Sequence, residues 1–111
     1  MQVKINDSYF TAELANDCIT RLKGLLGRRT MPPDTALVIC PCLSVHTWFM
    51  QFPIDVVFLD KSCKVLRVIK NMVPYKISPV VRGSYYVIEI LGGVLTADIK
   101  EGQIIELGGV G

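Results

Sequence analysis

The sequence predicts a mainly β fold, a small sandwich or jelly-roll-like barrel with one short helix packed on it. Three observations predict it. The chain has 111 residues, which is room for one domain spanning residues 1–111. Only one segment, near the N-terminus, has apolar residues at helical spacing. After Pro32-Pro33-Asp34 the chain divides into short apolar runs separated by turn signals, a pattern typical of sandwiches and small barrels.

The N-terminal segment predicts a hairpin followed by the helix. Val3–Ile5 and Tyr9–Glu13 flank the turn-forming residues Asn6-Asp7-Ser8. Asn16 or Asp17 can cap the helix, and Gly27 suits the position just past its end. The apolar stripe of this helix consists of Cys18, Ile19, Leu22, Leu25 and Leu26.

The rest of the chain predicts strands. Two of them, Ile54–Leu59 and Tyr85–Leu91, are apolar on both faces, so we expect them to be central in the fold. Pro74 to Gly83 predicts a long loop, and loops of that length often border functional sites. The other predicted strands are Ala36–Ile39, Val45–Phe49, Val65–Met72 and Ile104–Leu107.

Composition narrows the function classes. Half of the residues are hydrophobic and the mean hydropathy is +0.41, which leaves room for an apolar surface patch and a partner face. The net charge is +2, and the basic residues are dispersed apart from a short group between Arg21 and Arg29. A nucleic-acid binder usually has a basic stripe, so no nucleic-acid partner is expected.

Targeting and redox signals favour a cytoplasmic protein. The first ten residues have no long apolar core of a secretory signal. Residues 35–54 contain no Asp, Glu, Lys or Arg, but Pro41 and Pro53 interrupt this stretch. A buried β segment therefore explains it better than a membrane span, and no membrane partner is expected. Without an export signal, we expect the four cysteines to stay reduced.

Three blocks of sequence resemble one family. The run from Pro41 to Asp60, which includes His46-Thr47-Trp48-Phe49-Met50-Gln51-Phe52-Pro53-Ile54-Asp55, is similar to the signature of the domain of unknown function 192 family. The blocks Arg21-Leu22-Lys23-Gly24-Leu25-Leu26-Gly27-Arg28 and Tyr85 to Gly92 are similar to two further motifs of that family. The resemblance implies a compact β sandwich with a short helix, and it implies no established reaction. Cys63 stands where the family usually has a turn glycine, and Gln51 where it often has a basic residue.

The histidine and cysteine residues give weak signals of chemistry. His46 is the only histidine, and Cys40-x-Cys42-x3-His46 lacks the second ligand pair of a zinc site, so no metal or other cofactor is expected. Cys42 and His46 could form a nucleophile–base pair. On an extended strand they would lie about 13 Å apart at about 3.3 Å per residue, so the pair would need a bend after Cys42.

Two carboxylates in apolar strands give the strongest signal. Asp55 and Glu89 interrupt the two strands predicted to be central, so each should be buried and either paired or protonated. A structural ion pair with Arg21, Arg28, Lys70, Arg82 or His46 would explain them, as would an acid at the rim of a sheet or a ligand pocket. If Val45–Phe49 and Ile54–Leu59 form a hairpin, His46 lies opposite Asp55.

The sequence is compatible with two functions. The favoured interpretation is a binding module with a small polar pocket that recognises a small molecule, peptide or protein partner. The alternative is a small acid–base enzyme that uses Asp55, Glu89 and His46, which would have to converge on an open pocket. The candidate ligand-binding residues in both cases are Arg21, Cys42, His46, Asp55 and Glu89.

Overall fold

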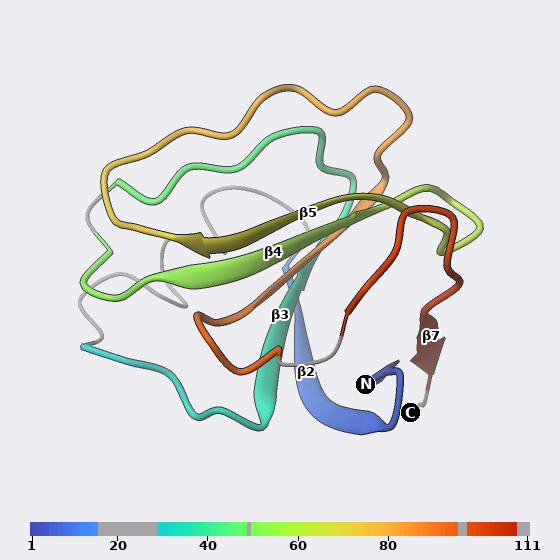
Figure 1. The fold of residues 1–111 in the computed structure, drawn as a ribbon, viewed down its shortest axis with the longest axis horizontal. Coiled ribbons are helices and arrows are strands. Elements are labelled where there is room, and N and C mark those ends of the chain that lie inside the picture. The colour runs from blue at the N-terminus through green and yellow to red at the C-terminus, as the bar shows by residue number, and fades with distance from the viewer. Residues whose placement is uncertain (16–28, 49, 96–97, 109–111) are drawn as a thin grey trace.

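The computed structural model describes residues 1–15, 29–48, 50–95 and 98–108, and their seven strands form one curled sheet (Figure 1). The strand order across the sheet is β5-β4-β6-β3-β2-β1-β7. The strands are β1 (Gln2–Ile5), β2 (Ser8–Ala15), β3 (Thr35–Ile39), β4 (Ile54–Leu59), β5 (Val65–Met72), β6 (Tyr86–Leu91) and β7 (Glu106–Gly108).

The mainly β prediction is confirmed, but the strands form a half-barrel rather than the predicted sandwich or jelly-roll-like barrel. The reason is the pairing of β2 with β3, which is parallel and joins the N-terminal hairpin to the central strands in one continuous sheet. The described residues contain no helix, and the predicted helix lies on residues 16–28, outside the described residues. No helix in the described part of the chain is long and apolar enough to cross a membrane.

The N-terminal hairpin is confirmed. β1 and β2 are antiparallel, with Ile5 opposite Ser8, so Asn6 and Asp7 make the turn. Asn6 has a φ of +53°, the left-handed conformation that asparagine adopts more readily than most residues and that tight hairpin turns require.

The two strands predicted to be central are interior and buried. β4 lies between β5 and β6, and all six of its residues are buried. Their side chains alternate between two hydrophobic clusters on opposite faces of the sheet. Ile54, Val56 and Phe58 belong to one cluster, which we call the first core, and Val57 and Leu59 belong to the second core.

Two extended segments, residues 41–48 and 73–82, run antiparallel to each other across the first core, and we call them the paired loops. Val45 and Val81 contribute their side chains to that core. Figure 1 shows the two segments side by side at the top of the view. The predicted strand Val45–Phe49 is therefore reduced to one isolated bridge, His46 to Ile77. Prolines within both segments remove backbone donors and prevent a longer ladder.

Candidate functional site

Asp55 is buried as expected, and a bulge in the neighbouring strand supplies hydrogen bonds to it. The β4–β5 register gains one residue on β5 between the pairs Ile54–Met72 and Val56–Ile69. Asn71, within the bulge, has a φ of +54° and donates its backbone N–H to Asp55 Oδ1 at 2.7 Å. The local distortion of β5 therefore aims a backbone donor at the buried carboxylate.

The loop after β6 supplies two further donors to Asp55. The backbone N–H groups of Gly93 and Leu95 lie 3.2 and 3.4 Å from Asp55 Oδ2. Lys70, a predicted ionic partner of Asp55, donates instead to the carbonyl of Leu95. Asp55 has no exposed surface and accepts three backbone hydrogen bonds, which is the arrangement of a structural carboxylate.

Glu89 is also fully buried, but it lies on the other face of the sheet. Asp55 is opposite Ile90 on β6, and Glu89 is opposite Val56 on β4. Because successive residues on a strand point to opposite faces, Asp55 points towards the second core and Glu89 towards the first. The sheet separates the two carboxylates, so they do not form a convergent acid–base pair.

His46 is not the cross-strand neighbour of Asp55, and the predicted hairpin is wrong. His46 is opposite Ile77, while the partners of β4 are β5 and β6. The two segments are close in the chain but do not pair with each other: the segment of His46 pairs with the second paired loop, and β4 pairs with β5 and β6. The His46 ring contacts the Trp48 ring, with centroids 5.5 Å apart and planes tilted by 37°.

The contacts of the described cysteines indicate structural rather than catalytic roles. Cys42 is half-buried against the first core, and its Sγ donates to the Ser44 carbonyl at 3.1 Å. Cys40 and Cys63 are free thiols. Burial raises the pKa of the Cys63 thiol, and the nearby charge of Asp60 raises it further, which disfavours the reactive thiolate.

The other expectations about the site concern Arg21 and metals. Arg21 lies outside the described residues, so its place in a site stays a prediction. Within the described ranges, no group of three or more His, Cys, Asp or Glu side chains is arranged to hold a metal ion.

An exposed apolar surface on the paired loops was not assigned from the sequence. Six large hydrophobic side chains there are between 45% and 67% exposed. We call them the apolar face; they are Leu43, Trp48, Val73, Tyr75, Ile77 and Val80. His46 lies among them, because the His46–Ile77 bridge puts both side chains on one side of the loops and Trp48 contacts the His46 ring.

Buried polar groups on the inner side hold the paired loops together. Thr47 has no exposed surface; its Oγ1 donates to the Val73 carbonyl at 2.7 Å and accepts from the Lys76 N–H at 2.9 Å. Ser78 Oγ, also buried, accepts from the Val45 N–H at 3.0 Å. Their neighbours Trp48 and Ile77 are 49% and 67% exposed, so the usual polar-out, apolar-in pattern is reversed here.

This reversal has a sequence signal that is visible only once the pairing is known. Thr47 precedes Trp48, and Ser78 follows Ile77, so in each segment a small hydroxyl residue adjoins a large apolar one. Either residue of each pair could face inward. The hydrogen bonds that place the hydroxyls inside join segments about 30 residues apart, and no local pattern predicts such contacts.

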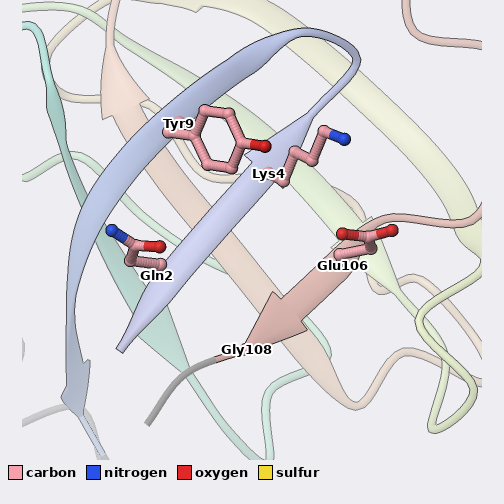
Figure 2. Close-up of a pocket in the computed structure, with 5 residues that line it drawn as sticks. All are labelled: Gln2, Lys4, Tyr9, Glu106 and Gly108. Atoms are coloured by element: carbon pink, nitrogen blue, oxygen red, sulfur yellow. The ribbon is translucent and has the colours of Figure 1, made fainter. Parts of the chain in front are cut away.

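A hollow of about 100 Å³ lies elsewhere on the sheet, over β1, β2 and β7 (Figure 2). It is lined by Gln2, Lys4, Tyr9, Glu106 and Gly108, and none of the predicted site residues is among them. Lys4 lies across the sheet from both Tyr9 and Glu106. Ligand pockets usually enclose about 300 Å³ or more, so this hollow is too small for most organic ligands.

Comparison with known proteins agrees with the resemblance found in the sequence. The model of the DUF192 family, described as "Uncharacterized ACR", matches residues 1–107. No curated protein is similar enough to this chain to count as a match.

Two solved structures have the same fold. A protein of unknown function from Novosphingobium aromaticivorans superposes with a TM-score of 0.80 at 24% identity, over 96% of this chain and 82% of that one. A protein from Sinorhizobium meliloti, described as a "putative transcription regulator", gives a TM-score of 0.76 at 22% identity, over 95% of this chain and 89% of that one. At these identities the likeness shows the fold alone.

Proposed function

The chain belongs to the DUF192 family, and on that premise we propose that it is a binding module that recognises its ligand or protein partner through the apolar face of the paired loops. The observation that carries the proposal is the reversed burial pattern. Thr47 and Ser78 are buried, whereas Trp48 and Ile77 face solvent. Exposed apolar patches of this kind often mark interaction sites.

The proposed recognition surface differs from the one that the sequence predicted. The sequence favoured a small polar pocket built from Arg21, Cys42, His46, Asp55 and Glu89. Of these, His46 lies among the residues of the apolar face, and Cys42 adjoins Leu43 in the same loop. The two carboxylates are buried on opposite faces of the sheet, so no observation favours the alternative of an acid–base enzyme. A cytoplasmic location stays a prediction.

Binding of the apolar anionic dye 8-anilinonaphthalene-1-sulfonate tests the proposal. We expect the folded protein to enhance the fluorescence of the dye, because the dye needs exposed apolar surface. Ile77→Ser should remove most of the enhancement. Ile104→Ser is the matched control, since Ile104 is 58% exposed, against 67% for Ile77, and lies outside the paired loops.

Two results would contradict the proposal. One is the absence of any enhancement by the folded wild-type protein. The other is an equal loss in Ile77→Ser and Ile104→Ser, which would mean that the paired loops have no special capacity to bind. Circular dichroism of each variant establishes that it is folded.

A further inference from the structure

The charge of the chain is distributed unevenly along the sequence that contains the paired loops. Residues 61–88 contain six basic residues and no acidic residue, although the whole chain has 12 basic and 10 acidic residues. All six basic side chains are exposed. They are Lys61, Lys64, Arg67, Lys70, Lys76 and Arg82. Half of the basic residues of the chain therefore lie in the segment that includes the second of the paired loops.

The first paired loop adds no negative charge. Residues 35–54 contain no Asp, Glu, Lys or Arg, and the acids that follow the two segments, Asp55 and Glu89, are fully buried. The acids that precede them, Asp34 and Asp60, lie outside the paired loops. The exposed charges on the paired loops are thus Lys76 and Arg82, both positive. A surface that is apolar and only positive is complementary to a partner that is apolar and negative.

The types of apolar residue on the face indicate which class of partner it suits. Four of the six, Leu43, Val73, Ile77 and Val80, are aliphatic, and aliphatic side chains do not provide the stacking that single-stranded nucleic acids use. The other two, Trp48 and Tyr75, are the residue types enriched where a bilayer meets water. A second copy of the chain would bring the same positive charges together, which opposes association.

We propose that the apolar face docks on the surface of an anionic phospholipid bilayer. Aliphatic and aromatic side chains would enter the headgroup region, while Lys76 and Arg82 would contact lipid phosphates. This inference rests on the proposed function and names the partner. It departs from the expectation of no membrane partner, which came from the lack of a spanning segment; docking on a surface needs none.

The expected effects follow from the charges and from the position of Trp48. Each basic residue near an anionic bilayer strengthens binding about fivefold, so Lys76→Gln combined with Arg82→Gln should weaken binding about 25-fold. Trp48 is the only tryptophan and lies on the apolar face. Its fluorescence should shift to shorter wavelength when the ring leaves water.

The experiment uses the full chain and sedimenting vesicles of phosphatidylcholine, with or without 30% phosphatidylglycerol, a fraction of about one lipid in three chosen to give a negative surface potential. We expect binding and a Trp48 blue shift with the anionic vesicles only, weakened by added salt. Ile77→Ser should reduce binding and Ile104→Ser should not. Lys4→Gln with Lys100→Gln is the matched charge control and should change binding less than about twofold, because neither residue lies on the paired loops.

Several results would overturn the inference. They are no binding to either vesicle, equal binding to both, or equal loss in the loop variants and their controls. Sedimentation velocity that shows a dimer lost in Ile77→Ser would assign the face to a second copy. Binding of an acidic apolar peptide or of an oligonucleotide at the face, with none to vesicles, would assign it to that partner. If the wild-type protein binds the dye, Ile77→Ser does not, and neither binds vesicles, the proposed binding function is supported and the bilayer is excluded as the partner.

Discussion

Replacing Asp55 tests whether this carboxylate is a structural group. It accepts backbone hydrogen bonds from Asn71, Gly93 and Leu95 at 2.7, 3.2 and 3.4 Å, and it has no exposed surface. In Asp55→Asn the side-chain oxygen can still accept from Asn71. The new amide group, however, is a donor that faces the N–H groups of Gly93 and Leu95.

The loss of stability can be estimated from those contacts. A buried donor left without an acceptor costs about 1–3 kcal/mol, and the Leu95 contact is long enough to contribute little. We therefore expect Asp55→Asn to lower the free energy of unfolding by about 2–4 kcal/mol, a large share of the roughly 5–15 kcal/mol of a typical domain.

Asp60→Asn is the matched control. Asp60 Oδ1 accepts two backbone hydrogen bonds, from Ser62 at 2.8 Å and Lys64 at 3.0 Å, but in an exposed turn. The asparagine Oδ1 can still accept both bonds, and the new amide group can donate to water, so this change should cost less than about 1 kcal/mol. Urea unfolding, analysed at a common m-value, measures both variants. Equal losses would refute the reasoning that burial makes the Asp55 contacts costly to remove.

Three further predictions concern the paired loops, the turn after β6 and Cys63. Thr47→Val should lower the free energy of unfolding in urea by about 2 kcal/mol, because it removes two buried hydrogen bonds. Thr35→Val should lower it less, because the 2.7 Å bond from Thr35 to the Pro32 carbonyl is exposed. Equal losses in the two variants would contradict this prediction. Gly92→Ala should destabilise by about 1–3 kcal/mol, since its Cβ would lie 2.8 Å from Asn71 Oδ1 and 3.0 Å from the Pro53 carbonyl oxygen, whereas Gly108→Ala, with nothing within 4 Å, should be neutral. The raised pKa of Cys63 means that the folded state holds the thiol proton more tightly than the unfolded state. The free energy of unfolding should therefore keep its full value below the ordinary thiol pKa of 9.0 and decrease as the pH rises through the folded pKa. Cys63→Ser should flatten that decrease, and an unchanged pH profile would contradict the assignment.

Local sequence patterns predicted most of the strands, although Val45–Phe49 is not one of them. Ile54–Leu59 and Val65–Met72 have the observed bounds, and the hairpin around Asn6 is formed, because alternation and turn residues are local signals. The burial of Asp55 and Glu89 also followed from their apolar neighbours. Each of these conclusions depends on residues within a few positions of one another.

The arrangement of the candidate site could not be predicted, because it depends on long-range pairing. Asp55 and Glu89 fall on opposite faces only because Asp55 is opposite Ile90, and a shift of one residue would put them on the same face. Likewise, the exposure of Trp48 depends on the contact between its segment and a loop about 30 residues away. Such registers are set by tertiary packing, for which the sequence has no local signal.

Nuclear magnetic resonance mapping with a library of fragment-sized compounds tests whether the paired loops present the recognition surface. Fragments collect at surfaces suited to binding, whatever the natural partner is. We expect the backbone amide signals of His46, Ile77 and Val80 to shift most. The largest shifts around the hollow near Gln2 and Glu106, or no shifts at all, would contradict it.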